Sequence, residues 1–151
     1  MQHPPINKLD YSYIDDGIFI GTNYCCVTHF DDVLKEKEGI EADLSLEGER
    51  IDNPFGVDYF VWLPVIDHTA PKLEQLEFGV AVLKKWIGMN KKVYVHCQNG
   101  HGRAPTMVAA YLINKGMGVE EAIEFIKDKR DSIHLNDMQV EVLHKFAKII
   151  K

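Results

Sequence analysis

The sequence has few cysteines, no long apolar run and no excess of basic residues. Its three cysteines are odd in number, and Cys25 and Cys26 are adjacent, which makes a poor disulfide framework and fits a reducing compartment. A role for Cys25 and Cys26 as redox partners of a reactive cysteine is an open alternative. No apolar run is long enough to cross a bilayer. No second Cys/His pair has zinc-ligand spacing, so we expect no metal and no cofactor.

The charge and the N-terminus exclude further classes. The net charge of −6 argues against a bulk nucleic-acid-binding surface, although a local anion site can be positive on an acidic protein. The stretch "MQHPPINKLDYSY" has neither the basic nor the apolar region of a signal peptide. We therefore expect a cytoplasmic monomer that binds neither membranes nor nucleic acid.

The 151 residues suit one domain, 1–151, with an ordinary globular composition of 46% hydrophobic and 26% charged residues. The hydrophobic pattern predicts strands that alternate with helices and then give way to helices. Strands are expected over 11–14, 18–20, 40–46, 57–65 and 92–97, and helices over 28–39, 69–87, 103–115, 119–130 and 136–150. This pattern predicts an α/β fold, a central and mostly parallel sheet flanked by helices, with ligands at the carboxyl ends of the strands.

Local signals set several expected boundaries. Gly17 indicates a hairpin turn between the first two strands, Thr28 a helix N-cap and Gly39 a helix stop. Pro64 is expected to end the strand over 57–65, and Pro71 to lie in the first turn of the helix that starts near Thr69.

The stretch "VYVHCQNGHGRAPT", residues 93–106, carries the clearest chemical signal. A strand ends at a cysteine, a glycine-rich loop follows, and Arg103 opens a helix. Backbone N–H groups of such a loop, the helix N-terminus and the planar guanidinium all favour a bound phosphate. The same surroundings stabilise a thiolate in proteins generally. The alternative, a cysteine packed as a small hydrophobe, does not account for the glycines and the arginine together.

The segment "HCQNGHGRAPT" resembles the Cys-x5-Arg signature of the protein tyrosine phosphatase superfamily. Its place well inside a short chain resembles the minimal, atypical dual-specificity branch. "GIFIG" resembles an early strand of that family, and "LPVID" resembles the segment that carries its general acid. The resemblance implies a dual-specificity-phosphatase-like catalytic domain with its phosphate-binding loop between a strand and a helix.

The resemblance assigns roles to residues of the loop. It implies that Cys97 is the nucleophile, that Arg103 clamps the phosphoryl oxygens and that His96 orients the loop and supports the thiolate. His96 is alternatively a satisfied core histidine, and both roles are compatible. The phosphate-binding backbone would come from Gln98, Asn99, Gly100, His101, Gly102 and Arg103.

A proton donor for the leaving alcohol is also required. Asp67 is the candidate, because it follows a strand thirty residues before Cys97. The alternative is a helix cap. Asp58 is a rival at the start of the same strand and at the wrong end of the sheet. His68 is a further candidate to tune or replace Asp67.

The C-terminal third offers supporting residues. Gln139 in "SIHLNDMQ" matches a family segment whose amide can contact the site, but Asn136 and Gln139 also have capping-box spacing. Arg130 either places that segment or is a surface residue. Ala104 replaces the serine or threonine that is common after the arginine, which predicts slow breakdown of the phosphoenzyme, and Thr106 is the candidate to compensate.

The expected function is a metal-independent phosphatase that hydrolyses phosphotyrosine, phosphoserine and phosphothreonine monoesters, in proteins or small molecules, through a cysteinyl-phosphate. Three alternatives are open: a pseudophosphatase that binds phosphate without turnover, a phosphoinositide phosphatase, and a rhodanese-like sulfurtransferase. The neutral side chains of Gln98 and Asn99 argue mildly against phosphoinositides, and the Cys-to-Arg spacing argues against the sulfurtransferase.

Overall fold

The computed structural model describes residues 9–23, 30–51 and 56–150. Its centre is a five-stranded sheet in the order β1-β2-β5-β3-β4. The strands are β1 Tyr11–Asp15, β2 Ile18–Gly21, β3 Ile40–Glu47, β4 Tyr59–Val65 and β5 Lys92–His96. β1 and β2 pair antiparallel, and the other three neighbouring pairs are parallel. The predicted α/β fold with a mostly parallel sheet is therefore confirmed.

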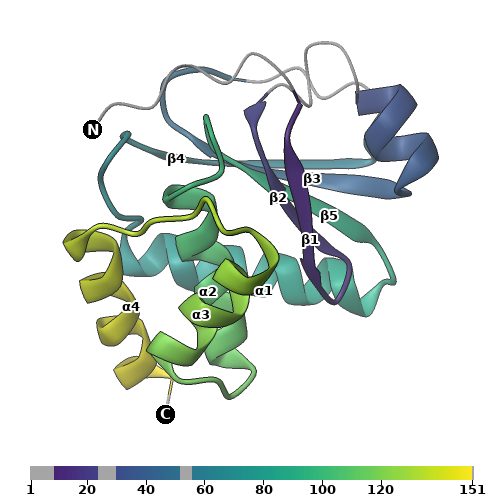
Figure 1. The fold of residues 1–151 in the computed structure, drawn as a ribbon. Helices are drawn as coiled ribbons and strands as arrows, with labels where there is room; N and C mark the ends of the chain where they lie inside the picture. Colours follow the sequence, from purple (N-terminus) through teal and green to yellow (C-terminus); the bar gives the residue numbers. More distant parts are fainter. Residues whose placement is uncertain (1–8, 24–29, 52–55, 151) are drawn as a thin grey trace.

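Four α-helices cover one face of the sheet (Figure 1). They are α1 Leu73–Gly88, α2 Arg103–Asn114, α3 Val119–Lys129 and α4 Asp137–Ile149. α2 lies in the middle of this layer, where it contacts the other three helices and three of the strands, and its residues from Arg103 to Ile113 are buried. A π-helix, η2 Phe30–Lys37, packs against β3. The loop ahead of α2 is thus fixed by the most enclosed helix of the molecule.

The strand alternation separates two different faces. On β5, Val93 and Val95 belong to the large apolar core beneath the helices. Tyr94, between them, belongs to a smaller cluster on the opposite face, with Phe19, Leu34 and Ile40. That opposite face also carries the fully buried His96 and, on β3, the buried polar side chains Asp43, Ser45 and Glu47. Polar groups therefore lie under the carboxyl ends of the central strands.

Most predicted boundaries agree with the structure to within a few residues, but the start of α1 does not. The helix begins at Leu73, with Lys72 as its N-cap, so the expectation that Pro71 lies in the first turn is wrong. The N–H and hydroxyl of Thr69 both donate to the carbonyl of Ile66, at 3.0 and 2.6 Å, in a separate tight turn. Since the residue before a proline is disfavoured in helical geometry, the helix starts only beyond Pro71.

The structure also shows the outcome of several smaller expectations. Gly17 and Gly39 have φ angles of 81° and 77°, as a hairpin turn and a helix stop require. β4 runs one residue past Pro64, which an edge strand tolerates because one of its sides has no ladder partner. Thr28, Cys25 and Cys26 lie outside the described residues. Within the described part of the chain, no helix is both long and apolar enough to traverse a bilayer.

Candidate active site

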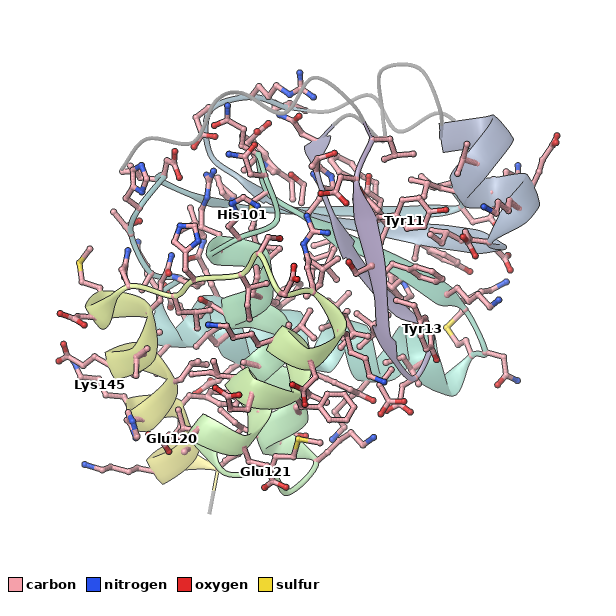
Figure 2. The ribbon with its side chains drawn as sticks, in the orientation of Figure 1. Tyr11, Tyr13, His101, Glu120, Glu121 and Lys145 are labelled. Atoms are coloured by element: carbon pink, nitrogen blue, oxygen red, sulfur yellow. The ribbon has the colours of Figure 1, made fainter. Side chains whose placement is uncertain are left out.

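The predicted loop lies at the carboxyl edge of the sheet. Cys97 follows the last residue of β5, and Arg103 is the first residue of α2. Figure 2 shows His101 of this loop at one end of the helical layer, far from Glu120 and Glu121 at its other end. The strand-loop-helix order that the sequence predicted is confirmed.

The backbone carbonyls of five consecutive loop residues each accept a hydrogen bond from outside the loop. The donors are Asn23 N to Gln98 at 3.1 Å, Arg130 Nη2 to Asn99 at 3.0 Å, Arg130 Nε to Gly100 at 3.0 Å, His134 N to His101 at 2.9 Å and Thr106 Oγ1 to Gly102 at 2.7 Å. In a trans peptide the N–H points opposite to the carbonyl. The N–H groups of residues 99–103 are therefore turned away from these donors, which is the arrangement of an anion-binding nest.

Arg130 holds this loop from behind. Its side chain is 3% exposed, so the alternative of a surface arginine is wrong. Besides the two loop carbonyls, it contacts Ser12 Oγ at 3.1 Å and Asp10 Oδ1 at 3.5 Å in the β1 region. Gly100 makes room for it, because a side chain there would meet Arg130 Nη2 at 3.0 Å and the carbonyl of Gly21 at 2.8 Å, and its φ is +72°.

Arg103 faces the other way, toward two carboxylates. Its Nη1 and Nη2 contact both Glu49 oxygens at 2.5 and 3.2 Å, Nη1 donates to the carbonyl of Val65 at 2.8 Å, and Nη2 lies 3.3 Å from Asp67 Oδ1. Burial opposes the charge of Arg103, but the Glu49 hydrogen bonds, together with the charges of Cys97, Glu49 and Asp67, outweigh it and raise the pKa of the guanidinium. Arg103 is therefore a fixed cation whose planar fork is already oriented.

Cys97 is 3% exposed and contacts the apolar core on the helix-covered face. Cys97 is thus packed in the way that a small hydrophobic residue would be. This packing coexists with the electrostatic interaction between Cys97 and Arg103, which buried apolar cysteines do not share.

Asp67 lies just beyond the carboxyl end of β4, on the site's side of the sheet. It does not cap α1, whose N-cap is Lys72, so the capping alternative is wrong. Its carboxylate is 44% exposed, 3.3 Å from Arg103 and 3.6 Å from the imidazole of His68, which is 90% exposed. Asp58 precedes the first residue of β4 and lies at the opposite edge of the sheet, as expected. The structure thus places Asp67, and not Asp58, beside Arg103.

Gln139 combines the two roles that the sequence left open. The capping box is confirmed: Gln139 N donates to Asn136 Oδ1, and Asn136 N donates to Gln139 Oε1, both at 3.0 Å. Its amide also lies against the loop, because a side chain at Gly102 would meet Gln139 Nε2 at 3.0 Å. Gln139 Nε2 donates to the carbonyl of Thr69, and Asn136 Nδ2 to that of His68. The start of α4 therefore holds the Asp67 loop in place.

Thr106 is buried, and its hydroxyl donates to the carbonyl of Gly102 at 2.7 Å. This bond uses the one proton that the hydroxyl can donate. Thr106 would have to leave it to serve the thiolate of Cys97 in the way that a serine at position 104 would.

Sequence reasoning missed Glu49 and Asp43. Glu49 follows β3 at the same sheet edge as the loop, and this position after a parallel strand was the signal that could have identified it. Asp43 lies within β3, fully buried, with Oδ1 3.0 Å from Nε2 of His96. A charged residue in an alternating strand is normally solvent-facing, so no sequence signal indicated this contact.

Among the described residues, no group of three or more His, Cys, Asp or Glu side chains is arranged to hold a metal ion.

Comparison with known proteins identifies the family of the chain. Residues 19–149 match the dual specificity phosphatase catalytic domain. The chain belongs to this family, within the protein tyrosine phosphatase superfamily.

Individual relatives have names that refer to more than one kind of phosphatase. The mouse protein named phosphatidylglycerophosphatase and protein-tyrosine phosphatase 1 is 43% identical over 90 residues, covering 58% of this chain and 47% of the mouse protein. The chain thus matches about half the length of this relative. The cattle protein tyrosine phosphatase type IVA 3 is 33% identical over 150 residues, 95% of this chain and 75% of that protein.

Solved structures share the fold. PTPMT1 in complex with PI(5)P has a TM-score of 0.79 at 30% identity, covering 93% of this chain and 96% of that one. Human DUSP28 has a TM-score of 0.84 at 17% identity, covering 98% and 99%, which shows a common fold alone.

Proposed function

We propose that the protein is a metal-independent, cysteine-dependent phosphatase. The observation that carries this proposal is the loop of residues 97–103: five successive carbonyls bond outward, the N–H groups face the opposite side, and Cys97 and Arg103 stand at the two ends. A tetrahedral dianion fits such a nest, and the nucleophile is adjacent to it.

The reaction then takes two steps. The Cys97 thiolate attacks phosphorus, the S–P bond forms as the P–O bond to the leaving group breaks, and Asp67 gives its proton to the leaving oxygen. Water then attacks phosphorus and gives a proton to Asp67, and the S–P bond breaks to release phosphate and the thiolate. Arg103 and the loop N–H groups stabilise the charge on the equatorial oxygens in both steps.

We propose phosphotyrosine, with phosphoserine and phosphothreonine, as the first substrate class, because the loop side chains Gln98 and Asn99 are neutral. The second candidate is a phosphorylated lipid headgroup. It is favoured by the name of the mouse relative, which is 43% identical over the matched residues, and by the PI(5)P complex of a 30%-identical structure.

The test is phosphate release in the presence of a chelator, from an aryl phosphate, a phosphotyrosine peptide, and PI(5)P or phosphatidylglycerophosphate in detergent micelles. Turnover that survives the chelator and is lost in Cys97→Ser supports the proposal. The ratio of kcat/KM values assigns the substrate class. Unchanged turnover in Cys97→Ser would overturn the proposal of a cysteine-dependent phosphatase. Phosphate binding without turnover by the folded wild type would favour a binding module.

A further inference from the structure

A buried polar layer lies behind β5, on the sheet face away from the four α-helices. The rings of Tyr94 and His96 lie side by side, with centroids 5.6 Å apart. The Tyr94 hydroxyl donates to the carbonyl of Thr22 at 2.7 Å, and it passes over Gly21, where a Cβ would lie 2.1 Å from the oxygen. The imidazole of His96 is thus held in a tightly packed setting directly before the nucleophile.

Asp43 is the acidic member of this layer. Its Oδ1 lies 3.0 Å from Nε2 of His96, and both side chains are 0% exposed. A carboxylate taken out of water is unfavourable unless a cation or hydrogen bond compensates it. A carboxylate at Nε2 in turn favours a proton on that nitrogen. Nδ1 is then the ring nitrogen of His96 that gains or loses a proton. It is the nitrogen nearest the main chain of His96, and the Cys97 peptide follows directly in that main chain.

We propose that Asp43 is a positioning residue for the reaction: it fixes His96 with a proton on Nε2 and favours its cationic form, which in turn stabilises the Cys97 thiolate. This proposal rests on the proposed function, since it assigns a cause to the nucleophile's ionisation. Asp43 itself touches neither substrate nor the reacting sulfur.

Other charged groups also lie around Cys97 and Asp43. Arg103 is the second cation that acts on Cys97, and Glu49 and Asp67 offset part of its charge. On the Asp43 side, Glu47, another buried acid of β3, pairs with Asn23 Nδ2 at 2.7 Å and Arg50 Nε at 2.9 Å. Glu47 therefore gives a matched control: a buried carboxylate in the same strand and layer with different partners.

The experiment measures the rate at which Cys97 reacts with iodoacetamide between pH 4.5 and 9, in the full chain without substrate. Trypsin releases residues 93–103, after Lys92 and Arg103, as a peptide with Cys97 as its one cysteine, so mass spectrometry follows this thiol alone. In Asp43→Asn, the pH midpoint of alkylation should rise by about one unit, so the rate falls about tenfold below both midpoints. Glu47→Gln should leave the midpoint in place.

Each other outcome contradicts the proposal. An unchanged midpoint in a folded Asp43→Asn means that Asp43 only packs the sheet. A lower midpoint means that Asp43 acts on the thiolate as a nearby anion. If the wild-type midpoint itself equals that of a free thiol, about 8.5, the proposed nucleophile fails instead, which separates the two claims.

A second measurement needs no variant and covers the case in which Asp43→Asn does not fold. The ¹⁵N spectrum of histidine-labelled wild-type protein reports which nitrogens of His96 carry protons. Nε2 should stay protonated throughout pH 5 to 8. A His96 whose Nε2 is unprotonated at neutral pH would overturn the proposal.

Discussion

The two sides of the proposed phosphate site are built differently. On the loop side, the side chains that hold residues 97–103 are buried: Arg130 is 3% exposed, His96 0% and Gln139 2%. On the opposite side, Glu49 and Asp67 are 40% and 44% exposed and contact the site through Arg103. The first side is fixed by packing and the second by a few polar contacts.

This difference separates binding from proton transfer. A nest of N–H groups stabilises charge only if it is held rigidly before the substrate arrives, and burial of its supports provides that. A proton donor has to meet solvent to exchange its proton, so an exposed aspartate suits the task. Changes on the buried side should therefore affect stability and rate together, and changes on the exposed side should affect rate alone.

The largest effect that tests the contrast is expected for Asp67→Asn. Loss of the proposed general acid should lower kcat for alkyl phosphates by about 10²- to 10³-fold and remove the decline of kcat at high pH. The free energy of unfolding should change by less than about 0.5 kcal/mol, because the side chain is half exposed. Parallel pH–rate profiles and chemical denaturation check both points, and a strongly destabilised variant would break the comparison.

Arg130→Met should lower both the stability of the protein and kcat. It leaves the carbonyls of Asn99 and Gly100 without their donors, so we expect a loss of roughly 2–4 kcal/mol of stability and about a tenfold fall in kcat. The exposed Lys127→Met serves as the control, because Lys127 lies in α3, whose C-cap residue is Arg130. A variant with normal stability but no turnover would show that Arg130 does not act by holding the loop.

Glu49→Gln should have a smaller effect, and it should strengthen the binding of phosphate. Its carboxylate occupies the fork of Arg103 that a phosphate also needs. Removing this negative charge should lower the inhibition constant of inorganic phosphate a few-fold, with little change in stability, because exposed charges interact weakly. Weaker inhibition by phosphate would mean that Glu49 serves mainly to orient Arg103.

Asp16→Asn gives a reference outside both sides of the site. Asp16 accepts hydrogen bonds from Lys115 and Tyr111, which hold its pKa below the usual value and fasten the β1–β2 turn to α2. Asparagine tolerates the φ of 54° at this position.

The variant should lose less than about 1 kcal/mol at pH 7, with kcat unchanged. Because the folded pKa is depressed, the stabilisation is present above the unfolded pKa and is lost as pH falls through the folded pKa. Thermal unfolding at pH 7 and pH 3 should therefore show a difference between variant and wild type that is smaller at pH 3 than at pH 7. An equal difference at both values would contradict an ionic origin.

Local patterns in the sequence were enough to predict the helices, the strands and the loop of residues 97–103. The alternation in "IEADLSL", the turn at Gly17 and the capping box at Asn136 and Gln139 each depend on neighbours within a few residues, and each appears in the structure. The predicted start of α1 was wrong because the restriction that Pro71 places on its preceding residue outweighed the helical periodicity.

The support of the loop was harder to predict because it depends on long-range contacts. Arg130 is thirty residues from the carbonyl that its Nε holds, and Asp43 lies 53 positions from His96. No spacing rule relates such residues before the sheet order is known. Glu49 and Asp67 meet at Arg103 because β3 and β4 are parallel neighbours, which places their carboxyl ends together.

The central claim is that Cys97 carries the phosphoryl group during turnover. Position 104 is alanine and offers no hydroxyl to the proposed intermediate, and the Thr106 hydroxyl is engaged with Gly102. Acid quench during steady-state turnover of an aryl phosphate, followed by mass spectrometry of the peptide 93–103, tests the claim directly. We predict that the peptide gains one phosphoryl group on Cys97 and that an initial burst of product matches its amount. Rapid turnover with Cys97 unmodified at all quench times would contradict it.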